Sequence, residues 1–390
     1  MHGAGVTVTG GAPTGPATRR SAVARLGMVA VLFCVAAPRS LPAQTVTPDA
    51  QDRPTPHWFR WGWQRTDLLR YNRVEGASVG ARAQAYPETA LGPVSVGATV
   101  RLGSADRVVN LRVDLSRETL GGRLAIAGFR ELAAVEEGTR PLGLVNSMTA
   151  LVGGRDDGDY YRRSGVALTW TPPSARRQSF LVRAWAERHQ AVEASTHFAL
   201  ARVADDGWRF RPNLTAAEGW DVGAALTLSP WWGSDPREAQ GGLEGTLRVA
   251  EGAWSYRTLA LTGCAEIPLA ERVRVALAVG GGSSWGTPPP QRRFAVGGSG
   301  SLRGFDPYTL SGPDLLRGRV TVSRRWAFGV VSAFSDAAWA GEASAFALSR
   351  VLASAGAGVA IADGRIHADA AWGVRGPASF RLELYLDGAR

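Results

Sequence analysis

The chain has 390 residues, of which 45% are hydrophobic and 20% charged. All 44 of its basic residues are arginine, and its formal net charge is +10. No uninterrupted apolar run of about 18 residues follows position 45, which excludes a helical membrane protein. The apolar content excludes a disordered chain, and two cysteines are too few for a disulfide scaffold.

The N-terminal segment has the order and size of a secretory signal. Arginines at 19–25 precede an apolar stretch at 26–37 and a small-residue exit at 41–44. A membrane anchor is disfavoured because twelve apolar residues cannot cross a bilayer core of about 30 Å. A lipoprotein is disfavoured because a phenylalanine precedes Cys34. We therefore predict a cleaved signal peptide over residues 1–44.

After this segment, apolar and polar residues alternate in stretches of about ten residues. Val109, Leu111 and Val113, for example, are separated by Asn110 and Arg112. Period two indicates strands, and about ten residues is the length of a tilted strand that spans a membrane. The polar faces mix arginine and acids with glycine and serine, which suits a wet lumen. The pattern predicts an all-β, transmembrane antiparallel β-barrel as one domain over 45–390. A secreted β-sandwich is the alternative.

Sixteen segments follow the pattern, and bacterial barrels have an even number of strands. The first is included partly for this parity, so fourteen strands stay open. Three long connections, 131–163, 190–219 and 285–313, fall on one side, which we expect to be extracellular. The segments are 57–66, 77–86, 94–103, 108–116, 122–130, 164–172, 179–189, 220–229, 242–250, 255–267, 272–284, 314–326, 330–339, 349–362, 365–374 and 379–387.

The third long connection carries the most specific motif. It is rich in glycine, with Gly297 and Gly298 ahead of the tetrad Leu302-Arg303-Gly304-Phe305. This resembles the sixth extracellular loop of BamA/TamA-like outer-membrane proteins, the bacterial surface antigen superfamily. The stretch 334–338, Phe-Ser-Asp-Ala-Ala, is similar to a second motif of that family, with Ala338 in place of a glycine. Weaker likenesses to related barrels lie at 71–76 and 210–213.

The resemblance implies a loop, at about 285–313, that folds into the barrel lumen. Its arginine would then meet a carboxylate on the inner wall, which places Arg303 against Asp336. A guanidinium in a crowded lumen needs a partner, and arginine binds a carboxylate through two parallel hydrogen bonds. The alternation of side chains along the strand places Asp336 on the same face of the sheet as Ser332, and Trp339 on the opposite face. The alternative is that Arg303 is a solvated loop residue.

The resemblance also implies a function in protein insertion into, or translocation across, the cell outer membrane. Unfolded outer-membrane or secreted proteins would be the clients, and outer-membrane lipid the surroundings. The sequence leaves no room for the periplasmic POTRA modules of that family between Gln44 and the first strand, so a separate periplasmic module is an expected partner. The alternative is a passive or plugged pore, or a structural barrel without protein clients.

Signals for other functions are weak. The stretch 76–80 has the spacing of a nucleophile elbow but no following helix, so we predict no enzyme and no catalytic residues. The histidines have no metal-ligand spacing, and Asp156, Asp157 and Asp159 are more typical of a solvated acidic loop than of a calcium site. We predict no metal, no cofactor and no nucleic-acid partner, because no basic patch is interleaved with aromatic residues.

Overall fold

A computed structural model describes residues 59–62, 68–90, 92–136, 141–173, 179–235, 237–362 and 366–386. The predicted signal peptide and the last four residues lie outside these ranges. No α-helix of the described residues has the length and apolar character needed to cross a membrane.

The described residues form twenty-one strands and one α-helix. Nineteen strands belong to one sheet, and β15 and β16 form a separate pair. The helix is α2 (Leu144–Gly153). The strands are β1 (Phe59–Trp61), β2 (Leu69–Asn72), β3 (Gly76–Ala85), β4 (Glu88–Thr89), β5 (Gly92–Gly103), β6 (Val109–Thr119), β7 (Gly122–Ala134), β8 (Tyr160–Thr171), β9 (Ser179–Gln190), β10 (Gly219–Ser229), β11 (Trp231–Trp232), β12 (Gln240–Gly252), β13 (Tyr256–Ala270), β14 (Val273–Gly286), β15 (Phe294–Val296), β16 (Leu310–Gly312), β17 (Asp314–Trp326), β18 (Gly329–Gly341), β19 (Leu352–Ile361), β20 (Ile366–Arg375) and β21 (Phe380–Leu386).

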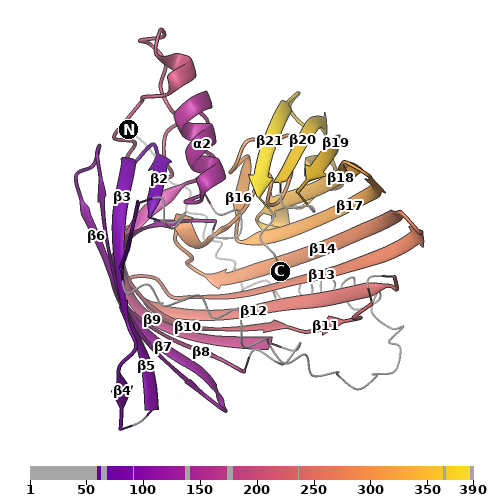
Figure 1. The fold of residues 1–390 in the computed structure, drawn as a ribbon. Coiled ribbons are helices and arrows are strands. Elements are labelled where there is room, and N and C mark those ends of the chain that lie inside the picture. Colours follow the sequence, from indigo (N-terminus) through magenta and orange to yellow (C-terminus); the bar gives the residue numbers. More distant parts are fainter. Residues whose placement is uncertain are drawn as a thin grey trace, which may run out of the picture. The chain divides into compact units, whose positions relative to one another are not determined.

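The sheet is antiparallel, and each long strand pairs with the next long strand along the chain. The ladders run without interruption from β3 through β5 to β10, then through β12, β13, β14 and β17 to β21. Figure 1 shows that the sheet is strongly curved. Its two outermost members are β21 and the pair β1 and β2. Among the described residues, no ladder joins these two edges.

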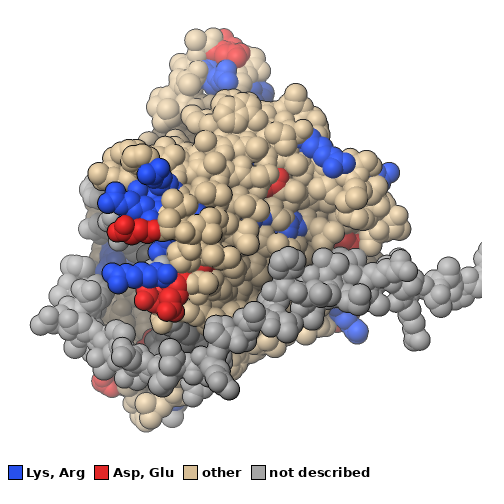
Figure 2. All heavy atoms as spheres, turned by 90° about the vertical axis from the view of Figure 1, so that its right-hand side faces the viewer, with Lys and Arg blue, Asp and Glu red and all other residues tan. Residues whose placement is uncertain are grey.

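Alternation along each strand separates an apolar outer face from a charged face. In β6, Val109, Leu111 and Val113 are 45 to 51% exposed, whereas Asn110 between them is 2% exposed. The same exposure of Val, Leu, Ile and Trp recurs on most long strands. The face in Figure 2 is broad and mainly uncharged, with arginines and acids gathered largely at its margins. One side of the sheet therefore offers apolar side chains where a soluble sandwich would bury them.

The structure departs from the predicted segments in two places. The predicted first strand, 57–66, lies partly outside the described residues, and strand structure here is divided between β1 and β2. Both parts pair with β3, β1 with Ala81–Ala83 and β2 with Gly76–Val79. The connection predicted over 131–163 is also shorter than expected. Strands β7 and β8 extend into it as a continuous ladder, and helix α2 occupies its middle.

The three long connections pack together at one end of the sheet, as their common side predicts. Gln291 hydrogen-bonds both the amide and the carbonyl of Ala217, which joins the third connection to the second. Asn213 of the second connection accepts hydrogen bonds from Arg73 and from the amide of Tyr160. These contacts join the three connections to one another.

Candidate functional site

The connection between β14 and β17 folds back as a small hairpin of β15 and β16. Its tip holds the predicted glycine pair and tetrad. Gly297, Gly298 and Gly304 have φ angles of 131°, 72° and 86°. Side chains disfavour these angles, so glycine is needed for the reversal that presents Arg303.

Arg303 is 3% exposed, and its guanidinium lies between two carboxylates of the sheet. Its Nε and Nη2 donate to the two oxygens of Asp336 at 2.9 and 2.8 Å, in the bidentate geometry that arginine favours. Nη1 donates to Asp369 at 2.9 Å. The guanidinium carbon is 3.3 Å from the centre of the Phe334 ring, a cation–π contact. Arg319, which faces Asp336 across the β17–β18 ladder, binds the same carboxylate at 3.0 Å.

Apolar contacts hold the tetrad Leu302-Arg303-Gly304-Phe305 against the sheet. Leu302 and Phe305 are buried and pack with Val296, Leu315 and Ala338. Burying a side chain of this size stabilises a fold by about 1.5–3 kcal/mol. Arg303 is thus flanked by two apolar anchors, which exclude water from its ion pairs.

Gly297→Ala is expected to unseat the loop. A Cβ at Gly297 would lie 1.9 Å from the carbonyl oxygen of Asp306, and the φ of 131° adds backbone strain. We expect a loss of at least ~2 kcal/mol of unfolding free energy, measured by urea titration in lipid vesicles. Gly318→Ala is the matched control, because a Cβ there meets nothing within 4 Å. Equal stability of the two variants would contradict this account of the turn.

The other end of the same connection is held at the opposite part of the sheet. Arg292 Nη2 lies 2.5 Å from Glu187 of β9 and 3.0 Å from Asp221 of β10. Gln291 Nε2 lies 3.0 Å from His189 Nδ1. The connection therefore crosses from β9 and β10, where Arg292 binds it, to β18 and β20, where Arg303 binds it.

Glu187, His189 and Asp221 have the donor set of a metal site, and their ligand atoms lie within 4.8 Å of one another. The guanidinium of Arg292 already lies between the two carboxylates, where its positive charge offsets part of their negative charge. Because two carboxylates and an imidazole are hydrogen-bonded to protein groups here, we interpret the cluster as an anchor for the connection.

A third set of contacts joins the two edges of the sheet. Residues 155–159, which follow α2, form a strap between the β2–β3 turn and β21. On the first edge, Arg73 donates to Asp159 at 2.7 Å and its amide donates to Asp156 at 2.8 Å. On the last edge, Arg381 donates to Asp157 at 2.8 Å, and Arg155 donates to the backbone carbonyl of Leu382. Helix α2 itself contacts both β2 and β21 (Figure 1).

The strap is expected to hold at neutral pH and to loosen in strong acid. Burial alone would raise the pKa of the Asp157 carboxyl, but hydrogen bonds and charge from Arg155 and Arg381 outweigh it and lower the pKa below 3.8. A lowered folded-state pKa stabilises the fold above pH 3.8, and this stabilisation is lost as pH falls through the lowered value. Hydrogen exchange of β21 should therefore accelerate only below pH 3.8. Asp157→Asn should remove that step, and an unchanged profile in this variant would contradict the assignment.

The structure brings together all the predicted site residues: Gly297, Gly298, Leu302, Arg303, Gly304, Phe305 and Asp336. It also brings together the weaker likenesses at 71–76 and 210–213, because Arg73 hydrogen-bonds Asn213 and Phe210 packs on Tyr71. Asp369, Arg319 and Arg292 were not predicted as site residues, and Phe334 was named only as part of the motif at 334–338. Alternation shows that Asp369 is on a polar face, but only the strand register brings it to Arg303.

A transmembrane β-barrel has long antiparallel strands with an apolar outer face and a polar inner face. The strands of this sheet have one exposed apolar face and one face rich in arginine and acidic residues. The chain has a BamA-like barrel fold. It matches the crystal structure of BamA from Haemophilus ducreyi lacking POTRA domains 1–3, with a TM-score of 0.55, 14% identity, and coverage of 82% of this chain and 69% of that one. LpxR from Salmonella typhimurium matches with a TM-score of 0.26 and 8% identity, over 60% of this chain and 82% of that one, which is too low to support any argument. No family model and no curated protein matches the sequence.

Proposed function

We propose that the chain is a sixteen-stranded barrel of the cell outer membrane that inserts other proteins into this membrane or translocates them across it. The observation that carries the proposal is the seam between the two edges of the sheet. In the ranges that the structure describes, side chains of the strap connect these edges, and no backbone ladder does. The sixteen wall strands count β1 and β2 as two parts of the first.

The membrane location is supported by the outer face. Exposed Val, Leu, Ile and Trp side chains cover strand after strand, and burying such a surface in lipid removes it from water. Antiparallel strands satisfy their backbone groups across ladders, as a hydrocarbon surrounding requires. The third connection would then lie in the lumen, with Arg303 on the inner wall.

The insertion function is supported by the chemistry of the seam. An unpaired strand edge presents a row of N–H and C=O groups, and an extended client segment pairs with such an edge by β-augmentation. In this chain Arg155 takes up the carbonyl of Leu382 on β21, so a backbone acceptor of the last strand is held by a side chain. Releasing a few side-chain contacts costs much less than breaking a full ladder. A client strand could then replace the strap.

Assisted folding in vesicles tests the proposal. The purified full chain is reconstituted in phosphatidylcholine vesicles, a urea-denatured outer-membrane barrel is added, and the folded fraction is followed by heat-modifiable gel mobility. We expect folding several-fold faster than in empty vesicles, and faster again with Asp157→Asn, which weakens the strap. Asp206→Asn, at an exposed side chain, is the control.

Equal rates with and without the protein would contradict insertion and favour the alternative, a pore or structural barrel. Conductance in planar bilayers then separates an open pore from a plugged one. A separate periplasmic module, if the insertion function needs one, would raise the rate when periplasmic extract is added and leave empty vesicles unaffected.

A further inference from the structure

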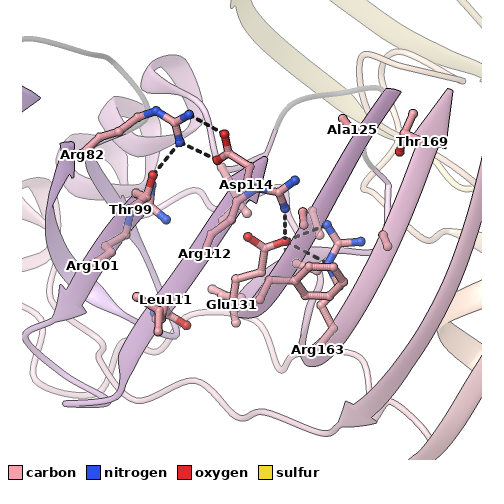
Figure 3. A pocket seen from close by; sticks show the side chains of 18 of the residues that line it. Arg82, Thr99, Arg101, Leu111, Arg112, Asp114, Ala125, Glu131, Arg163 and Thr169 are labelled. Carbon is pink, nitrogen blue, oxygen red and sulfur yellow. Dashed lines mark hydrogen bonds and ion pairs between the residues drawn. The ribbon is translucent and has the colours of Figure 1, made fainter. Parts of the chain in front are cut away.

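A cavity of about 960 Å³ lies against the charged face of β3 and β5 to β9. In the part of the chain that the structure describes, seven arginines line it, against two carboxylates, Asp114 and Glu131. Figure 3 shows Arg82, Arg112 and Arg163 gathered with these two acids on neighbouring strands. The walls therefore carry a large excess of positive charge.

Both lining carboxylates are paired with arginines. Arg82 binds both oxygens of Asp114, at 2.9 and 2.8 Å. Glu131 is shared by Arg112 at 3.3 Å and Arg163 at 2.8 Å. The guanidinium groups of Arg112 and Arg163 also lie over the ring of Phe129, at 5.7 and 5.0 Å from its centre. Stacking and ion pairing together hold the guanidinium groups in fixed positions at the wall.

Among the described residues, the acidic side chains behind the cavity wall do not balance the positive charge of the lining arginines. Arg70 pairs with Glu75, and Arg183 lies 3.7 Å from Glu187, which Arg292 already binds. Within the described ranges, adding both acids raises the carboxylates near the cavity to four, against seven lining arginines. Arg123 adds a charge near one end and donates to the neutral hydroxyl of Ser116 at 3.0 Å.

We infer that this cavity binds an anion that carries two or more phosphate groups. Guanidinium groups match phosphate oxygens through paired hydrogen bonds. The volume lies at the upper end of ligand pockets, which run from about 300 to 1,000 Å³, so one phosphate would leave most of it empty. A phosphorylated lipid headgroup and a free polyphosphate share this chemistry. The inference is independent of any protein client.

Calorimetry on the purified full chain in a neutral detergent tests it, with tripolyphosphate as the probe and ionic strength held constant. We expect saturable binding of one tripolyphosphate, with chloride and sulfate much weaker. The double substitution Arg112→Gln/Arg163→Gln should weaken binding about tenfold or more, because it removes two guanidinium groups that would make charge-assisted hydrogen bonds to the anion. Arg350→Gln, at an exposed arginine, should leave it unchanged.

Arg123→Gln is a second test that leaves the carboxylate pairs intact, so it remains informative if the double variant does not fold. It should also weaken binding. No saturable binding by the native chain, or equal binding by the cavity variants and Arg350→Gln, would overturn the inference. A soluble diphosphorylated glycolipid headgroup should compete with tripolyphosphate. Stronger binding of the headgroup assigns the site to lipid, and stronger binding of tripolyphosphate assigns it to free polyphosphate.

Discussion

Arg303→Ala is expected to lower the free energy of unfolding by about 3–5 kcal/mol and to release the connection from the sheet. Removing one partner of a buried ion pair leaves an uncompensated charge, which is the costly case. Here Asp369 would lose its arginine, and Asp336 would retain Arg319 alone. Urea titration in vesicles measures the loss, and limited proteolysis measures the exposure of the loop.

The double variant Arg303→Ala/Asp369→Asn separates charge from packing. Neutralising Asp369, which would have lost its ion pair with Arg303, should restore part of the lost stability, whereas a purely steric role of the Arg303 side chain predicts no recovery. Unchanged heat-modifiable mobility and unchanged protease resistance in Arg303→Ala would contradict the buried ion pair altogether.

Arg292→Ala is expected to destabilise the chain by a similar amount, about 3–5 kcal/mol, at the other end of the same connection. Glu187 and Asp221 are both fully buried and would lose the cation that lies between them. Unfolding by urea in vesicles is again the measurement.

Its neighbour supplies the control. Arg293 makes one long hydrogen bond, 3.4 Å, to the carbonyl of Pro288, so Arg293→Ala should change stability little. Arg292→Ala/Asp221→Asn should recover part of the loss. Equal stability of Arg292→Ala and Arg293→Ala would contradict the two-ended fastening of the connection.

The sequence was sufficient to predict most of the long strands, because exposed apolar side chains alternate with polar side chains of the opposite face along each strand. Val109 to Leu115 on β6 shows this, and so does β21. It was also sufficient to predict that Arg303 and Asp336 belong together, because both lie in motifs that resemble one family.

Features that depend on distant contacts could not be predicted. Asp369 reaches Arg303 only through the register of β18, β19 and β20. Arg292 lies in a proline-rich stretch that gives no sign of its partners on β9 and β10. Helix α2 begins at Gly143 with no side-chain cap and ends at a left-handed Gly154, so its start carries no sequence signal. The division of the first strand into β1 and β2 follows from pairing with β3, which alternation alone does not reveal.

Arg303 and Arg292 bind the connection to the sheet, and residues 155–159 bind the two edges of the sheet. The two sets of contacts meet at Arg381 of β21, which binds Asp157 of the strap and Asp306 of the connection. The amide of Gly304 also donates to Glu383 of β21. Loss of the strap contact at Asp157 should therefore also reduce the protection of the Arg303 loop.

Quantitative proteomics of the outer membrane after depletion of this protein from its native cells tests the proposed function most directly. Insertion predicts a selective fall in other barrels, with their precursors accumulating in the periplasm, and rescue by the native chain. An unchanged set of barrels after depletion would contradict it.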